Sequence, residues 1–234
     1  MNTMITVEDL TFELRRSERR RTIGITIGRQ GELIVSAPTD CPQDVIEQVA
    51  REKYGWIAAK LARKEMLFRP PATKTFVDGE GFYYLGRSYR LRIIQVASDD
   101  RSTPSLSLHK DRFLLRSDVV ERGEEQFVQW YIQQGYQWLQ QRIDAFAYRI
   151  DAHPQGIKVQ TLGYRWGSCT HSNILYFHWR VILLPLPMID YIVVHELVHL
   201  HERNHTPAFW DRVERAMPDY RERKRWLAEN GSRF

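Results

Sequence analysis

Alternating apolar and polar positions in the first forty residues predict short strands. The alternation is clearest at Ile23, Ile25 and Ile27, and a Gln30–Gly31 turn follows it. The strands are expected at residues 11–14, 22–27 and 33–36. Together they predict a small hairpin sheet at the start of the chain.

A helical pattern begins after this sheet and extends to about Phe68. Asp40 is the expected N-cap, Pro42 falls in the first turn, and Gln43 can reach back to the cap. Pro70–Pro71 ends the helix because proline lacks the backbone N–H that would continue it. The apolar residues form one stripe: Ile46, Val49, Trp56, Ile57 and Leu61.

Residues 74–117 return to strand character, with expected strands at 83–84, 89–94, 106–108 and 113–115. From Glu121 to Ile150 the apolar spacing becomes helical, and Gly135 in the apolar row permits close approach of a neighbouring element. The rest of this face is Phe127, Tyr131, Leu139, Ile143, Phe146 and Ile150. The change of pattern places a boundary near residue 118. We expect an N-terminal β-rich region with one long helix over 1–118, and a second domain over 119–234.

The second domain opens with strand patterns at 157–161 and 174–184. The longer strand should direct one set of side chains to the core: Leu175, Phe177, Trp179, Val181 and Leu183. Tyr176, His178 and Arg180 alternate with these residues and are expected on the other face, where they are available for a functional role. Pro185 and Pro187 stop the strand and start a helix that is apolar on most sides, so we expect this helix to be buried.

The composition is that of a folded globular protein, since 43% of the residues are hydrophobic and 27% are charged. The two cysteines are too few for a disulfide framework, and the first twenty residues lack the apolar core of a signal peptide. We therefore expect a cytoplasmic protein. The longest uncharged apolar stretch, residues 181–189, is less than half of the roughly 20 residues that a membrane helix needs, so we expect no membrane span.

Arginine dominates the positive charge: the formal net charge is +5, and 27 of the 34 basic residues are Arg. The guanidinium group is a planar, permanently charged fork that suits carboxylates and phosphates. Anionic peptides, nucleotides and nucleic acids are therefore all candidate partners. The 29 acids are interleaved with the arginines, and the basic run at 15–21 is short, which weighs against a dedicated nucleic-acid surface.

The apolar helix contains the sequence HELVH at residues 195–199. Two histidines at i and i+4 lie about 40° apart around a helix, so His195 and His199 can reach the same metal ion. Glu196 follows the first histidine and can take a proton from a metal-bound water. Burying three such groups without a compensating partner is costly in free energy, so the pattern predicts a metal site.

A third ligand is expected because catalytic zinc sites use three protein ligands and an open position. His205 follows His199 by six residues, and a turn at Arg203–Asn204 can bring it back to the metal. The spacing matches the metzincin pattern HExxHxxGxxH except that Glu202 replaces the glycine. Glu202 itself and, through the helix expected at 207–217, Glu214 are the alternative third ligands.

Cys169 is the other reactive side chain near these segments. A role as nucleophile or ligand stands beside the plainer reading of a small buried apolar residue. No His and Asn pattern of a cysteine protease accompanies it.

Tyr164–Cys169, Asn173–Pro185 and the HELVH helix resemble the YgjP-like family of metal-dependent hydrolases, a bacterial zincin-like group distantly related to the SprT-like proteases. The most specific pieces are RWGSC, the strand ending in LLP, and HELVHLHERNHTPAFW. The resemblance extends from the Pro38 region through Trp56 to Phe209–Trp210 and implies an α+β, zincin-like fold. We expect the metallopeptidase domain over 119–234, with a long helix, a mixed sheet with an edge strand, the HExxH helix and C-terminal helices. The resemblance also implies that His195, His199 and His205 bind one zinc ion and that Glu196 is the catalytic base.

Zinc-dependent hydrolysis of a peptide or protein is the leading hypothesis for the function. Tyr176, His178, Arg180 and Arg203 are the candidate substrate-binding residues. If strand 174–184 is the sheet edge beside the cleft, as in zincins, a substrate can add to it as an extended strand. The alternatives are a metal-dependent nucleotide phosphohydrolase and a nucleic-acid-associated protease or binding protein. The sequence leaves the oligomeric state open.

Overall fold

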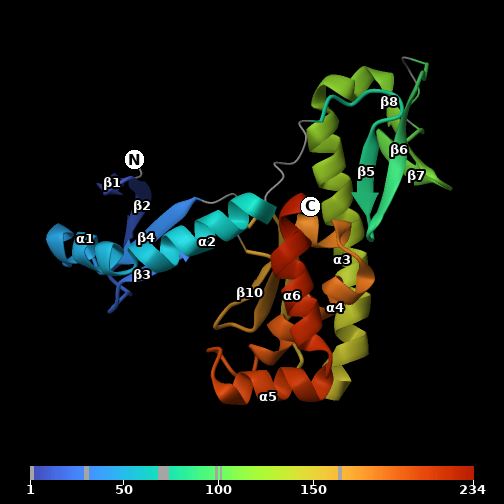
Figure 1. Ribbon diagram of the computed structural model, residues 1–234. Helices are drawn as coiled ribbons and strands as arrows, with labels where there is room; N and C mark the ends of the chain where they lie inside the picture. The colour runs from blue at the N-terminus through green and yellow to red at the C-terminus, as the bar shows by residue number, and fades with distance from the viewer. Residues whose placement is uncertain (1–2, 29–31, 68–73, 98–99, 101, 163–164) are drawn as a thin grey trace. The chain divides into compact units, whose positions relative to one another are not determined.

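The computed structural model describes residues 3–28, 32–67, 74–97, 100, 102–162 and 165–234. The described chain divides into two compact units, one over Met1–Pro70 and one over Pro71–Ser232 (Figure 1). It contains strands that pair in three separate sheets as well as long helices, so the fold class is α+β, as expected. None of the described helices is long and apolar enough to cross a membrane.

The first unit is a small sheet with two helices. Its strands are β1 (Thr3–Val7), β2 (Leu10–Arg16), β3 (Gly24–Ile27) and β4 (Leu33–Ala37), in the order β1-β2-β4-β3. Strand β3 pairs antiparallel with β4, which confirms the expected hairpin, while β2 pairs parallel with β4. Strand β1 was not expected. Phe12, Val35, Ile46 and Ile57 are fully buried in a core that belongs to this unit alone.

The single helix expected over 40–68 is two helices, α1 (Gln43–Glu52) and α2 (Tyr54–Leu67). The break falls at Lys53, and Gly55 is the second residue of α2, where the low helix propensity of glycine weakens a continuous helix. The N-cap of α1 is Pro42, without a side-chain cap, so the prediction of Asp40 as N-cap was wrong. A cap must adjoin the first helical turn, and Asp40 lies two residues upstream of Pro42. The Gln30–Gly31 turn, the Pro70–Pro71 helix end and Tyr164 lie outside the described residues.

The second unit begins with a sheet that packs on the long helix. Its strands are β5 (Gly81–Tyr84), β6 (Arg87–Ile94), β7 (Leu106–His109) and β8 (Arg112–Arg116), in the order β5-β6-β8-β7. A 3-10 helix, η1 (Ser117–Arg122), leads into α3 (Gly123–Ile150). The ring of Phe127 on α3 stacks on Phe82 with centroids 4.0 Å apart and meets the edge of Phe113 at 5.0 Å. The expected boundary near residue 118 therefore falls inside one hydrophobic core, and the compact units divide near residue 70 instead.

A second sheet in this unit contains β9 (Gly156–Gln160), β10 (Gly167–Cys169) and β11 (Ile174–His178), in the order β10-β11-β9. Strand β11 is central, so the expected edge strand 174–184 is in error, and β10 takes the edge position. The strand also ends early, at His178, where the chain turns into the 3-10 helix η2 (Trp179–Leu183). His178 Nδ1 accepts a hydrogen bond from Arg180 N at 3.0 Å and caps this turn.

Helix α3 presents the predicted face to the core, and all seven residues of that face are buried. A Cβ atom on Gly135 would lie 3.4 Å from Val159 Cγ1, so the glycine does permit the close approach of β9. The remaining helices are α4 (Leu186–Val198), α5 (Pro207–Ala216) and α6 (Tyr220–Asn230), followed by η3 (Gly231–Arg233). Helix α4 packs between α3 and α6 and is largely buried, as its composition predicted.

The turn between β5 and β6 connects the first sheet to the segment that precedes α4. Leu85 N and Gly86 N donate hydrogen bonds to the carbonyl oxygens of Ile182 and Leu183, at 2.8 and 3.0 Å. Gly86 has a positive φ of 79° and lies so close to Pro185 that a Cβ would come within 2.8 Å of Pro185 Cα. Glycine is required there on both counts.

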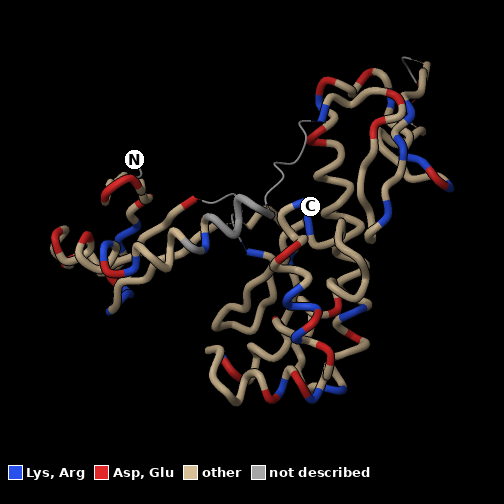
Figure 2. The backbone as a smooth tube through the Cα atoms, in the orientation of Figure 1, with Lys and Arg blue, Asp and Glu red and all other residues tan. Residues whose placement is uncertain are grey.

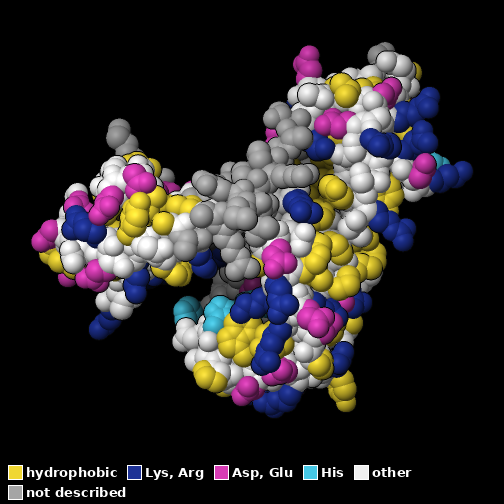
Figure 3. Space-filling model, in the orientation of Figure 1, with side chains coloured by type: hydrophobic (Ala, Val, Ile, Leu, Met, Phe, Trp, Pro, Cys, Tyr) yellow, Lys and Arg dark blue, Asp and Glu magenta, His cyan; other side chains and the backbone are white. Residues whose placement is uncertain are grey.

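Charged side chains of both signs are interleaved along the described chain in each unit (Figure 2). The space-filling view likewise shows basic and acidic groups side by side on the visible face of each unit (Figure 3). The arginine excess therefore does not collect into one basic surface on the face in view.

Candidate active site

Helix α4 brings the first candidate ligand and the candidate base into a buried position. Pro185 is its N-cap and Pro187 lies in its first turn, where proline is favoured. His195 and Glu196 lie in the last turn, and His199 is the C-cap residue. The rings of His195 and His199 have centroids 4.9 Å apart, as expected for residues at i and i+4.

The segment after α4 turns back and places His205 beside these two histidines. Glu202 N donates to Val198 O at 2.9 Å, which closes the turn, and the Thr206 side chain then caps α5. The Nε2 atoms of His195 and His205 lie 3.0 Å apart. Candidate ligand atoms of all three histidines lie within 4.8 Å of one another, so this group could hold a metal ion.

The two alternative third ligands lie apart from this group. Glu202 directs its carboxylate to Arg212, with Oε1 3.7 Å from Nε. Glu214 pairs with Arg221 across 3.5 Å. The backbone of Glu202 nevertheless contributes: its carbonyl oxygen accepts a hydrogen bond from His199 Nδ1 at 2.9 Å. A proton on Nδ1 leaves the Nε2 lone pair of His199 available to a cation.

Burial keeps the three imidazoles neutral. Burial lowers the pKa of His195 to about 3, and it also lowers the pKa of His199 and of His205. Neutral imidazole is the form that binds metals. His195 Nδ1 and Glu196 Oε2 are buried and have no hydrogen-bond partner within the described chain. A cation fits three neutral imidazoles whose ligand atoms converge, as the approach of the His195 and His205 Nε2 atoms shows, with the unsatisfied oxygen of Glu196 nearby. His195 Nδ1 belongs to the other side of its ring and is not explained by that cation.

Aromatic rings surround the histidines. The Phe209 ring lies 4.9, 4.6 and 4.7 Å, between centroids, from His195, His199 and His205. Trp210 stacks on His205 at 5.5 Å, with 24° between the ring planes. No role for these two residues was predicted from the sequence. Their position, four and five residues after His205, could have indicated that they lie close to that histidine. They fix the orientation of the imidazoles and keep their surroundings apolar.

Glu196 is held against the edge strand. Burial raises the pKa of Glu196 to about 8, against the opposing charge of Arg165. A Cβ on Gly167 would lie 2.7 Å from Glu196 Oε1, so the carboxylate occupies the space that a side chain in β10 would fill. A side chain at this position would therefore have to displace the carboxylate of Glu196.

Strand β10 has backbone groups next to Glu196 with which no other described strand pairs. Trp166 O accepts from His178 N at 2.8 Å, and Thr170 N donates to Ile174 O at 3.0 Å. Hydrogen-bonded and non-bonded pairs alternate in an antiparallel ladder. The backbone N–H and C=O groups of Gly167 and Cys169 thus face away from β11, on the side where no other described strand pairs with β10.

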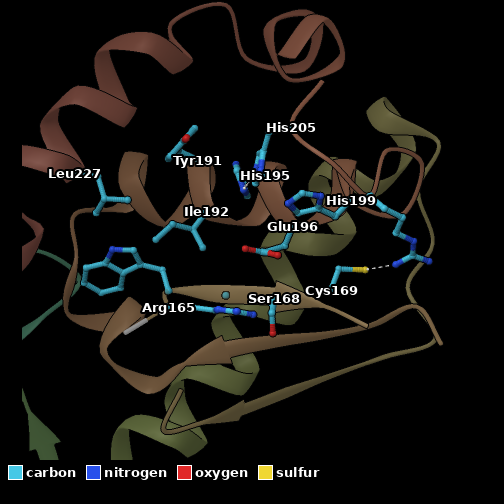
Figure 4. A pocket seen from close by; sticks show the side chains of 13 residues that line it. Arg165, Ser168, Cys169, Tyr191, Ile192, His195, Glu196, His199, His205 and Leu227 are labelled. Atoms are coloured by element: carbon cyan, nitrogen blue, oxygen red, sulfur yellow. Dashed lines mark hydrogen bonds between the residues drawn. The ribbon is translucent and has the colours of Figure 1, made fainter. Parts of the chain in front are cut away.

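A pocket of about 490 Å³ opens between α4, β10 and α6 (Figure 4). Its lining includes all three histidines, Glu196 and the residues of β10. Cys169 also lines it, with Sγ 3.1 Å from Arg203 Nη1. Burial raises the pKa of the Cys169 thiol despite this guanidinium, which disfavours the reactive thiolate.

Three of the four candidate substrate-binding residues do not line the pocket. Tyr176 pairs with Ser168 on the sheet face opposite Gly167 and Glu196. His178 is only 4% exposed and caps η2, while Arg180 lies over the ring of Trp179 at 5.2 Å. Arg203 does line the pocket, but its guanidinium is engaged by the β10–β11 hairpin.

Comparison with known proteins gives one family and one solved structure. The crystal structure of the metallopeptidase zymogen of Pyrococcus abyssi abylysin is 19% identical with a TM-score of 0.36, over 38% of this chain and 91% of that chain. No curated protein matches the chain. The family described as "YgjP-like, metallopeptidase domain" matches residues 21–230. Because this match spans most of the sequence, the chain belongs to the YgjP-like metallopeptidase family and is a metal-dependent hydrolase with a peptide or protein substrate.

Proposed function

We propose that the protein is a zinc peptidase in which His195, His199 and His205 hold one zinc ion and Glu196 acts as the general base. The observation that carries this proposal is the meeting of three neutral imidazoles with a buried carboxylate oxygen for which the described residues offer no hydrogen-bond partner. When bound, zinc supplies Lewis acidity, which makes water more acidic and polarises a carbonyl group.

Glu196 takes up and releases the proton in this proposal. Its carboxylate lies on the pocket side of α4, between the histidines and β10 (Figure 4). Among the described residues the Oε2 atom has no partner that would compete for a proton, and Gly167 leaves the carboxylate room beside the edge strand. Glu196 can therefore accept a proton from an attacking water on Oε2 and then donate it to the leaving amine.

The edge strand β10 binds the substrate backbone. The outward N–H and C=O groups of Gly167 and Cys169 can pair with an extended peptide, which then runs past Glu196. This assigns to β10 the role that the sequence had given to strand 174–184. Backbone pairing gives affinity without reading side chains, so selectivity must come from the walls of the pocket.

The substitution Glu196→Gln tests the base. It preserves size and removes the proton acceptor, so peptide hydrolysis should fall by roughly 10²- to 10⁴-fold while bound zinc stays at the wild-type level. Glu214→Gln on the surface of α5 is the matched control and should keep full activity. Full activity of Glu196→Gln with zinc retained would rule out the assignment.

Zinc analysis tests the ligands. His199→Ala and His205→Ala should each lose most of the bound zinc, because each removes one of three ligands. His201→Ala is the control, since His201 lies in the same segment, is exposed and is outside the histidine group. Wild-type zinc content in both ligand variants would overturn the site.

Nucleotide hydrolysis and nucleic-acid association lack a comparable observation in the described chain. The pocket lining does include two arginines, Arg165 and Arg203, but the guanidinium of Arg203 is engaged by the β10–β11 hairpin. The basic residues of the described chain are interleaved with acids along the backbone (Figure 2). Peptide hydrolysis is therefore the function that we propose.

A further inference from the structure

The pocket beside Glu196 has two chemically different ends. On one side of Glu196 lies Cys169 (Figure 4), and its Sγ atom is 3.1 Å from Nη1 of Arg203, so this side is polar. On the other side lie the apolar side chains of Ile192 and Leu227, with the charged side chain of Arg165 on the same side (Figure 4). An extended substrate that crosses Glu196 along β10 meets both ends, so the residues before and after its scissile bond enter different surroundings.

Three elements build the apolar end. Ile192 on α4 is 3% exposed and precedes Glu196 by one helical turn, which puts both side chains on the same face of the helix. Leu227 comes from α6 and Trp166 from the residue before β10. A Cβ on Gly231 would lie 3.0 Å from Trp166 and 3.3 Å from Leu227, so these two side chains converge on the same point.

The apolar end is partly open to solvent. Leu227 and Trp166 are neither buried nor fully exposed, and both line the pocket. Displacing water from such a surface by an apolar group is favourable in free energy. The occupant that this wall favours is a large apolar side chain.

We infer that Trp166, Ile192 and Leu227 form a specificity subsite for a large apolar side chain, such as Leu or Phe, adjacent to the scissile bond of the substrate. This inference rests on the proposed peptidase function and adds the substrate class to it. Ile192 places the subsite next to the base, because it lies one turn from Glu196 on α4. Leu227 makes α6 part of the substrate-binding machinery.

The first experiment maps cleavage by the zinc-loaded wild-type chain. A mixture of peptides of random sequence is digested and the cleaved bonds are identified by mass spectrometry. Leu, Ile, Phe and Met should be enriched at one position next to the cleaved bond. For matched peptides, replacing Leu by Ala at that position should lower kcat/KM on the order of 10- to 100-fold, the range for a few methylenes in an apolar pocket.

Two variants then test the wall itself. Leu227→Asn keeps the size but makes the wall polar, so the ratio of kcat/KM for the Leu peptide to that for the Ala peptide should fall at least about 5-fold. Leu227→Trp fills the space, so the Phe peptide should lose more activity than the Gly peptide. Ala228→Asn is the matched control, because Ala228 is exposed on the same helix and does not line the pocket.

The possible outcomes distinguish failure of the subsite from failure of the proposed peptidase function. If the zinc-loaded wild type cleaves no peptide, the proposed function fails. Cleavage without side-chain preference, or a preference that Leu227→Asn and Leu227→Trp both leave unchanged, overturns the subsite alone. Bound zinc and thermal melting of each variant identify a chain that has not folded, and the wild-type preference map remains decisive in that case.

Discussion

The Nη1 atom of Arg203 lies 3.1 Å from the Sγ atom of Cys169, and it donates a hydrogen bond to Thr170 O at 2.6 Å. The other guanidinium nitrogen bonds to the side chain of Asn173. Arg203 precedes His205 by two residues, so it fastens the segment that carries His205 to the β10–β11 hairpin. The candidate ligands and the candidate substrate-binding strand are held together by this side chain.

Loss of Arg203 should weaken metal binding. In Arg203→Ala the segment with His205 is released from the hairpin, and we expect the Kd for zinc to rise roughly 10- to 100-fold, as for other residues that orient ligands. Competition with a chromophoric chelator measures the Kd directly. Arg203→Lys should recover part of the affinity. Arg215→Ala, a change on the exposed side of α5, is the control, and equal affinities of all four proteins would contradict the positioning role.

Gly167→Ala should separate catalysis from metal binding. The new Cβ would lie 2.7 Å from Glu196 Oε1, so the carboxylate must move away from β10. We expect kcat for peptide hydrolysis to fall by at least about 10-fold while bound zinc is unchanged. Gly156→Ala in β9 of the same sheet is the control, because a Cβ there has nothing within 4 Å. Unchanged kcat in Gly167→Ala would show that the position of the carboxylate is not critical.

Trp210→Ala should loosen His205. The indole stacks on His205, Tyr220 stacks on its ring system at 5.5 Å, and Lys224 Nζ lies 3.8 Å from a ring centroid. We expect a loss of about 1–3 kcal/mol in the free energy of unfolding of the zinc-free protein, together with a higher Kd for zinc. Trp210→Phe keeps an aromatic ring and should retain most of both. Denaturant titration and chelator competition provide the two measurements.

The Arg142–Asp190 ion pair should stabilise the packing of α3 on α4. It is bidentate, with nitrogen to oxygen distances of 2.6 and 2.9 Å, and the Asp190 side chain is 15% exposed. Arg142→Met should cost roughly 1–3 kcal/mol of folding free energy. Arg149→Met on the exposed side of α3 should cost little. In a double-mutant cycle, Asp190→Asn should add almost nothing to Arg142→Met, and full additivity would contradict the coupling.

The long helix was predictable because its signal is local and redundant. Seven positions from Phe127 to Ile150 repeat with helical spacing, and the structure confirms their burial. Strand order is different in kind, because it depends on pairing between distant segments. The alternation from Leu175 to Leu183 was genuine, but Val181 and Leu183 are buried in a 3-10 helix, and the short β10 gave no pattern of its own.

The candidate site followed a similar division. The spacing of His195, His199 and His205 predicted that the three would meet, and the structure brings them together. Spacing alone could not reveal that α6 supplies Leu227 or that Gly167 accommodates Glu196, since both contacts join segments about thirty residues apart. Strand alternation also misplaced Tyr176, His178 and Arg180. Tyr176 lies on the sheet face opposite Gly167 and Glu196, His178 caps η2, and Arg180 follows the end of the strand.

The turn at Leu85–Gly86 limits how far the chain can be shortened. Its two backbone donors satisfy the carbonyl groups of Ile182 and Leu183, immediately before the helix that carries HELVH. A truncated chain that starts at residue 119 would leave these carbonyl groups without their hydrogen-bond donors. It would also remove Phe82, whose ring stacks on Phe127. The smallest fragment in which catalysis can be studied therefore has to retain β5 to β8.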